Sequence, residues 1–384
     1  MASERKHRVS VVVEGEQVDG WENYRIECSM ITPADAFMLK RPFDARAWNT
    51  LRKDARIRVL IDGVTILDGF IDRRTKSAKD GTMEFAGRDR CGRLVQESAP
   101  SINYSGLLLV EAIRRLAEPW FTAIVLSDAR NRSLRRGKGR RVPAGNEPIV
   151  VDLRVHKTSG KVQPGMTRWA VIEEIVSRAG YCVWSSADGK ELIIGKPNYT
   201  QAPQFLIVHP KEGSTTKATC KDLQIDEDIG DCYSLITVAG AGGSDEDSVN
   251  YGANASSMRG IVKDGPGLDG IGRNFLYAKR LFMPERNFAS NNDAQRVAAL
   301  EAARRNFRRQ VVTAQMPQHG QFIGTAAPTI FAPNTIARVI DEEFDPQLDK
   351  SFLIFGCVFE AAPGDDGGET TSLEMVPSGT EIVL

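Results

Sequence analysis

The sequence has few of the residues from which catalytic and metal centres are usually built. It holds four histidines and six cysteines among 384 residues. No histidine stands near another histidine, a cysteine or a carboxylate at the spacing of metal ligands. The G-x-S-x-G, H-E-x-x-H and phosphate-loop motifs are absent as well. We therefore expect a protein that is not an enzyme and that holds no metal or cofactor.

Two further absences concern charge and hydrophobic length. Lysine plus arginine and aspartate plus glutamate both number 50, so the formal net charge is zero. A chain without net charge does not bind polyanions through its overall charge, although local basic patches are still possible. The longest apolar runs are far too short to span a bilayer, and the N-terminus lacks a signal-peptide cleavage site. We expect assembly in a cytoplasm, without insertion into a membrane.

The six cysteines are scattered, and no C-x-x-C pair occurs. This spacing favours free thiols over a disulfide framework. Spacing alone leaves open whether Cys220 and Cys232 pair across a hairpin. The six positions are Cys28, Cys91, Cys182, Cys220, Cys232 and Cys357.

Glycine and proline are frequent, at 34 and 18 residues, which is typical of many short strands joined by turns. Three strands form a predicted antiparallel meander, ARIRVLIDG, VTILDGFID and GTMEFAGR, with a tight turn at Asp62-Gly63. Before it, Thr32 and Pro33 favour the start of a short helix, ADAFMLK. Two later segments, GLLLVEAIRRLAEPW and WAVIEEIVSRAGY, have helical spacing, and the hairpin CVWSSADGKELIIG follows the second.

The closing strands repeat the order and spacing of the first meander. Arg58 to Asp62 corresponds to Arg338 to Asp341 in this comparison. We therefore predict a mainly β, α+β fold: two similar antiparallel β-barrel domains with an inserted small α/β domain and a loop-rich insertion. The predicted domains and segments are a first barrel at 1–98, the α/β domain at 99–207, a second barrel at 208–384, its insertion around 241–291 and a helix around 292–310. The sequence leaves open which barrel takes residues 218–240.

A chain with two similar barrels can build a ring of three copies. Such a trimer has six similar units around one axis, with true threefold and approximate sixfold symmetry. A device that joins a sixfold tube to a threefold needle requires this combination.

Three stretches raise functional questions. Gly265 to Gly270 matches G-x-G-x-x-G, but a proline interrupts it and no βαβ pattern surrounds it, so we interpret it as a loop. A basic run lacks the interleaved aromatics of a single-strand binder; it is either a solvated loop or a contact for phosphates or an acidic partner. Its members are Arg130, Arg132, Arg135, Arg136, Lys138, Arg140 and Arg141.

The third stretch, Gly87-Arg88-Asp89-Arg90, stands at the end of the first meander. Along a strand Arg88 and Arg90 share one face and Asp89 takes the other. Arginine–carboxylate pairing there would fix the strand register or join neighbouring subunits. These three residues are therefore the candidate interface or register residues.

The order of these motifs resembles the baseplate hub protein of Mu-like contractile phages, a family more distantly related to the torus half of VgrG spikes. The first barrel of that family ends in a GRDRTxxLVD-like segment, which is similar to Gly87 to Arg90 followed by Leu94-Val95 here. Gln96-Glu97 replaces its acidic end. The middle segment TRWAVIEEIVSRAGYCVWSS and the closing segment PNTIARVIDEEF are similar to later parts of the family, and residues 241–291 match least.

The resemblance implies a structural virion protein: a homotrimeric ring at the centre of a contractile tail baseplate. A central spike would attach below it and the tail tube would stack above it. Wedge proteins would surround it and DNA would pass through its bore. Two alternatives stay open. One is the hub of a tailocin or of a type VI secretion-like spike. The other is a tail-associated cell-wall hydrolase module, which would need an acid pair or a metal site.

Overall fold

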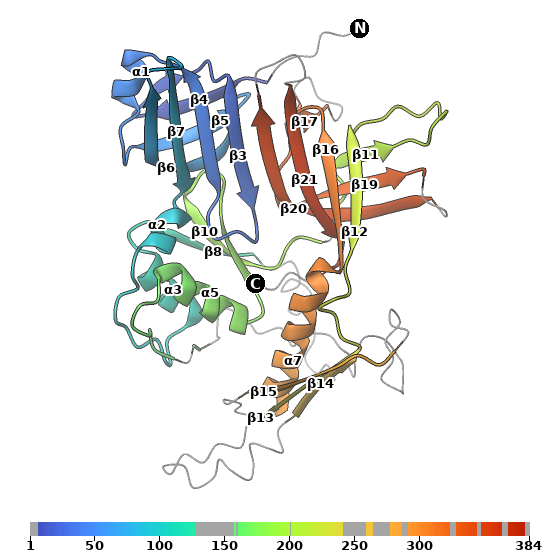
Figure 1. Ribbon diagram of the computed structural model, residues 1–384. Coiled ribbons are helices and arrows are strands. Elements are labelled where there is room, and N and C mark those ends of the chain that lie inside the picture. Colours follow the sequence, from blue (N-terminus) through green and yellow to red (C-terminus); the bar gives the residue numbers. More distant parts are fainter. Residues whose placement is uncertain are drawn as a thin grey trace.

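The computed structural model describes residues 7–127, 157–158, 160–199, 201–240, 259–263, 277–285, 291–322, 328–343, 347–362 and 368–380. Within these ranges the fold is mostly β, with few helices. A sheet of thirteen strands dominates it, beside two three-stranded sheets and one two-stranded sheet. Figure 1 shows the large sheet above two smaller units, one on each side.

The first half of the large sheet contains the predicted meander. Asp62 and Gly63 have positive φ angles of 49° and 83°, the tight hairpin turn that their sequence predicted. Side chains in the last strand alternate between buried and half-buried, as a sheet with one face on the core requires. The elements are β1 Val9–Val13, β2 Glu16–Val18, β3 Asn23–Ser29, β4 Ala36–Pro42, α1 Ala45–Thr50, β5 Arg56–Ile61, β6 Val64–Ser77 and β7 Thr82–Asp89.

The helix predicted over ADAFMLK is wrong, because this segment forms β4. Phe37 and Leu39 are buried while Met38 between them is less so, which is the period of a strand. β4 pairs with β3 on one side and with β7 on the other. These two ladders satisfy its backbone groups, so tertiary pairing outweighs the local helix-start signal of Thr32 and Pro33.

The second half of the sheet repeats the first. Its last three strands pair antiparallel in the same order as β5, β6 and β7, so the predicted repeat and fold class are confirmed. Figure 1 shows β11 and β19 running across the direction of β16 and β21. The strands are β11 Phe205–His209, β12 Asp222–Glu227, β16 Gln310–Met316, β19 Thr335–Asp341, β20 Leu348–Ala361 and β21 Glu369–Pro377. The small pair is β17 Gly320–Gln321 and β18 Thr329–Ile330.

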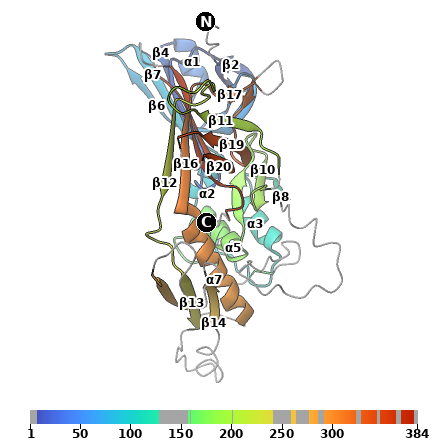
Figure 2. The same cartoon turned by 90° about the vertical axis from the view of Figure 1, so that its right-hand side faces the viewer.

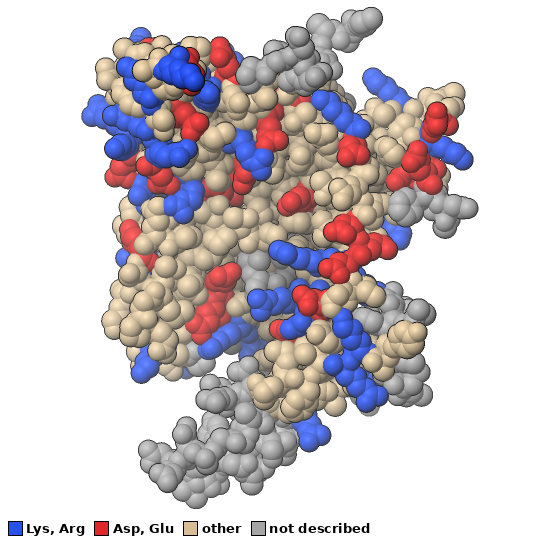
Figure 3. Space-filling model, in the orientation of Figure 1, with Lys and Arg blue, Asp and Glu red and all other residues tan. Residues whose placement is uncertain are grey.

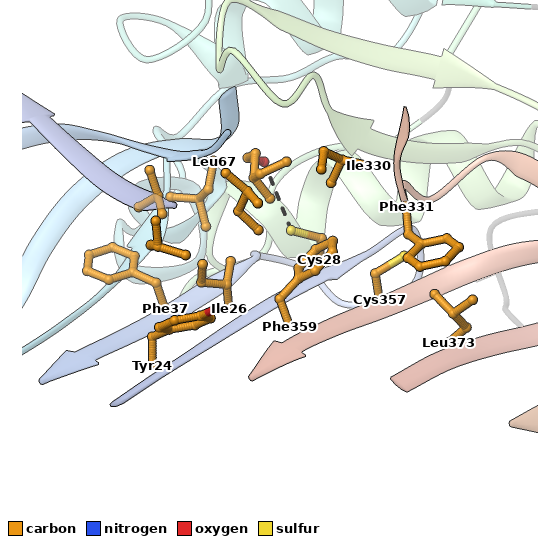
Figure 4. Packing of buried hydrophobic residues seen from close by; sticks show 14 of the residues in the cluster. Tyr24, Ile26, Cys28, Phe37, Leu67, Ile330, Phe331, Cys357, Phe359 and Leu373 are labelled. Atoms are coloured by element: carbon orange, nitrogen blue, oxygen red, sulfur yellow. Dashed lines mark hydrogen bonds between the residues drawn. The ribbon is translucent and has the colours of Figure 1, made fainter. Parts of the chain in front are cut away.

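The two halves form one continuous sheet because β3 pairs antiparallel with the second part of β20. One buried apolar cluster runs through both halves. Figure 4 shows Ile26 and Phe37 from the first half beside Phe359 and Leu373 from the second. The Cys28 thiol also faces the carbonyl of Ile66 at 4.0 Å. This core holds the two halves together as a single body.

A small α/β unit follows the first half and lies below it in Figure 1. Both predicted helices and the hairpin are present. The Thr167 hydroxyl accepts a hydrogen bond from the Ala170 amide at 3.2 Å and so caps the second helix. The elements are α2 Cys91–Gln96, α3 Leu109–Ala117, β8 Ala123–Ser127, α5 Arg168–Arg178, β9 Cys182–Ser185 and β10 Glu191–Gly195. β11 pairs with β19, so the strand at the predicted domain end belongs to the second half.

A further unit hangs below the second half (Figures 1 and 2). Residues 218–240 divide between two places, because β12 extends the large sheet while the next strand enters the small sheet. The predicted loop-rich insertion contributes two strands to this small sheet. Its elements are β13 Leu235–Gly240, β14 Arg259–Lys263, β15 Arg280–Glu285, α7 Asn291–Asn306 and the 3₁₀ turn Phe307–Arg309. α7 matches the predicted helix.

All six cysteines are buried and form no disulfide, as the scattered spacing predicted. Cys220 and Cys232 therefore do not pair. Of the helices in the described ranges, none has the length and apolar character needed to cross a bilayer.

Candidate functional site

The Gly87–Arg90 stretch lies where the first half of the sheet meets the α/β unit. β7 ends at Asp89, and α2 begins two residues later. A Cβ at Gly87 would stand 1.9 Å from the carbonyl oxygen of Phe70, so only glycine fits between β6 and β7 there. The three candidate residues therefore occupy a closely packed exit from the sheet.

Arg88 and Arg90 lie on one side of this exit, and each bonds to an aspartate of β6. The Arg88 Nε donates to Asp72 Oδ2 at 3.1 Å, with both side chains partly exposed. The Arg90 Nε donates to Asp68 Oδ1 at 2.9 Å. The Asp68 side chain is fully buried and also accepts two bonds from Arg56, at 3.1 and 2.9 Å. Two arginines thus satisfy one buried carboxylate.

Asp89 points the other way and connects the sheet to the α/β unit. Its carboxylate accepts hydrogen bonds from the Ser185 hydroxyl at 2.6 Å and the Gly92 amide at 3.3 Å. Burial raises the pKa of Asp89 to about 6, although its hydrogen bonds act in the opposite direction. Asp35 lies next to it, because the Asp89 amide donates to the Asp35 carbonyl at 2.9 Å. Burial and the neighbouring Asp89 raise the pKa of the Asp35 carboxyl well above its usual range.

A cavity of about 450 Å³ lies beside these two carboxyls. Both halves of the sheet and the α/β unit line it, through residues such as Ile66, Phe331 and Trp184. None of the described residues that line it is a lysine, arginine or histidine. The two carboxyls therefore hold a proton more readily than exposed carboxyls do, and they lie at the joint of three parts of the chain.

The described contacts of Arg88, Asp89 and Arg90 are made within the chain. A role for them between subunits stays a prediction. The basic run from Arg130 to Arg141 and the glycine motif from Gly265 to Gly270 lie outside the described residues, so their predicted roles also stay predictions.

A second polar contact, centred on His319, joins the two halves, and no sequence pattern pointed to it. His319 is fully buried and exchanges hydrogen bonds with the Tyr24 hydroxyl at 2.6 Å and the Thr371 hydroxyl at 2.8 Å. Burial lowers the pKa of His319 to about 3, so the ring is neutral at physiological pH. No sequence signal links Tyr24 with residues about 300 positions away.

The chemistry available in the described residues is limited. They contain no group of three or more histidine, cysteine or acidic side chains placed to hold a metal ion. Burial raises the pKa values of the Cys28, Cys91 and Cys357 thiols well above the ordinary value of a cysteine. These sulfurs therefore stay protonated and poorly nucleophilic. The site is better described as a set of polar contacts that connect the two halves of the sheet with each other and with the α/β unit.

Comparison with known proteins agrees with such a scaffold. The chain is 22% identical to a tail protein from Neisseria meningitidis MC58, with a TM-score of 0.69 and 98% of each chain covered. It is 15% identical to the 43 kDa tail protein of prophage MuSo2 from Shewanella oneidensis, with a TM-score of 0.71, covering 98% of this chain and 100% of that one. A chain of a PdpA–VgrG complex has a TM-score of 0.52 at 7% identity, covering 97% and 65%.

The fold is therefore that of phage tail proteins. Residues 8–89 match the family model of the Mu phage baseplate assembly protein GpP-like N-terminal domain, and the match ends at the last residue of β7. This match confirms the resemblance drawn from the sequence over the N-terminal segment. No curated protein sequence matches the chain.

Proposed function

We propose that this protein is the trimeric central hub of a contractile tail baseplate in a virion. The observation that carries the proposal is the internal repeat: two similar halves share one sheet, and β3 and β20 join them edge to edge. Three such chains supply six similar units, which suits a ring between a sixfold tail tube and a threefold spike. The GpP-like domain supports a place in the baseplate.

The hub acts mechanically in this proposal. The tail tube stacks on one face of the ring, the central spike attaches to the other, and wedge proteins contact its outside. DNA passes through the bore during ejection. The chain performs no chemical step in this proposal.

A second candidate is the hub of a tailocin or of a type VI secretion-like spike. The likeness to the chain of a PdpA–VgrG complex favours it, because the same fold occurs there. The two candidates share the ring and differ in what passes through it. Images of intact particles with this chain labelled separate them, since a phage has a DNA-filled head and the other devices do not.

Negative-stain electron microscopy of the purified chain tests the ring itself. The proposal expects annular particles with a central hole and threefold symmetry. Isolated particles without a hole, alone or with the spike protein added, would contradict it. A muralytic assay on the same sample should show no lysis; clear lysis would support a cell-wall hydrolase instead.

A further inference from the structure

The two halves of the large sheet can be aligned through their strand registers. β6 and β20 each carry one bulge against the next strand, after Ile71 and after Ile354. Placing one bulge on the other matches Thr75 of β6 with Val358 of β20. The strands that follow in the sheet order then match as well: β7 with β21, β4 with β16, and β3 with β12.

The alignment gives a residue-level match at the far end of each half. Phe37 of β4 corresponds to Val312 of β16, because they oppose matching residues of β7 and β21. Ile26 of β3 opposes Phe37, and Ile225 of β12 opposes Val312. Ile26 therefore corresponds to Ile225, and β12 occupies in the second half the place that β3 has in the first.

The equivalent strands differ in one respect. β3 pairs with β4 and also with β20 of the other half, where Glu27 opposes Val358. Among the described strands, β12 pairs with β16 alone, and its side chains are mostly exposed. The outer part of β6, from Arg73 to Ser77, likewise pairs only with β7 among these strands, since its register with β5 ends at Phe70. Each is an edge with unpaired backbone groups, which can template another strand.

We infer that β12 of one copy pairs antiparallel with the outer part of β6 of the next copy. The register follows from the β3–β20 seam: Asp226 opposes Thr75, just as Glu27 opposes Val358. Glu227 then opposes Arg74, and Ile225 opposes Lys76. The inference rests on the proposed ring, and it names the surfaces through which the copies meet.

The charges of the two edges are complementary in this register. β12 ends in Asp226 and Glu227, followed by Asp228, whereas Arg73 and Arg74 lie on β6. Opposite charges facing each other across a strand pair stabilise it and set its register. The chain's own seam has such a pair in the same region, because Arg25 on β3 bonds to Glu360 on β20. Figure 3 shows basic side chains gathered at the upper left and an acidic group at the middle right, near the lower end of β12.

The two edges lie on opposite sides of the molecule. In Figure 1, β6 is toward the left of the sheet and β12 toward the right. Contact between different surfaces of successive copies is heterologous, and a heterologous contact closes into a ring when its rotation divides the circle. The β3–β20 pairing relates the two halves within one chain. Pairing of β12 with β6 would relate the second half of one copy to the first half of the next in the same way.

Disulfide trapping in the full chain tests the register. The variant carries Thr75→Cys and Asp226→Cys, two exposed positions that should lie within disulfide distance across the interface. Background is low because the six native cysteines are buried. The matched positive control is Glu27→Cys with Val358→Cys, the equivalent pair in the chain's own seam, which should link within one chain. The negative control, Thr75→Cys with Asp222→Cys, displaces the partner by four residues, about 13 Å along the strand.

We expect mild oxidation to convert most of the 75/226 variant to covalent dimers and trimers, at least tenfold more than the 75/222 control. Equal yields from the two variants would overturn the inference. If the unmodified chain has the mass of a trimer but the 75/226 variant does not link, the strand pairing is wrong and the proposed hub stands. If linking succeeds but electron microscopy shows open chains of copies, the pairing stands and the closed hub fails.

Discussion

The guanidinium of Arg90, at the exit of the first half, donates to the fully buried carboxylate of Asp68 on β6 at 2.9 Å. Removing the carboxylate would leave the half-buried Arg90 guanidinium without its ionic partner, with only its bond to the Trp120 carbonyl. We expect Asp68→Ala to lower the free energy of unfolding by about 2–3 kcal/mol. The matched control is Asp72→Ala, since its pair with Arg88 is partly exposed and should cost under about 1 kcal/mol. Urea unfolding measures both, and equal losses would refute the role given to Asp68.

Asp89 should make stability depend on pH. Burial raises its pKa to about 6, above the value of about 3.9 in an unfolded chain. The folded state therefore binds more protons between these values, and its stability falls as pH rises from 4 to 7. The Asp89→Asn variant lacks this ionisation. Between pH 4 and pH 7, we expect the free energy of unfolding of the wild type to fall by up to about 3 kcal/mol relative to that of Asp89→Asn. Urea unfolding measures the free energy of unfolding of both proteins. If the difference between them stays constant with pH, the raised pKa of Asp89 is contradicted.

The seam between the two halves depends on its apolar core. Phe359 on β20 is fully buried in the cluster shared by both halves. We expect Phe359→Ala to cost about 3–5 kcal/mol of unfolding free energy, through lost burial and the cavity that remains. Phe282, exposed on β15, provides the control, and Phe282→Ala should change stability by less than about 0.5 kcal/mol. Calorimetric melting compares the two variants; a small effect at Phe359 would argue against a shared core.

The buried thiols should be unreactive in the folded protein. All six cysteines are buried and form no disulfide, and burial raises the pKa of several of them. A chromogenic aromatic disulfide should therefore titrate almost no thiol under native conditions and six per chain in denaturant. Rapid native labelling of even one cysteine would show that the fold opens at that position.

Local patterns in the sequence predicted much of this fold. The Asp62-Gly63 turn, the meander around it and the helix capped by Thr167 follow from turn residues and apolar spacing close by in the chain. β4 was predicted as a helix because its start resembles a cap, whereas its ladders with β3 and β7 decide its structure. Local propensity carries no information about such ladders.

The candidate site was less predictable. The sequence indicated the alternation around Asp89, but Ser185 lies 96 residues further on and bonds to it only after folding. The seam of β3 with β20 likewise joins residues more than 300 positions apart. Long-range contacts of this kind leave no periodic signal, so the joints between the parts of the scaffold appear only in the structure.

The mass of the chain in solution tests the central claim most directly. We expect analytical ultracentrifugation at micromolar concentration, in physiological buffer, to give three times the chain mass of 42.3 kDa. Reversing the acidic edge with Asp226→Lys and Glu227→Lys should shift this species to monomer, while the same change on Glu111 and Glu118, at α3 of the α/β unit and outside the two paired edges, should not. A wild-type protein that stays at 42.3 kDa at every concentration, with or without the spike protein, would contradict the trimeric hub.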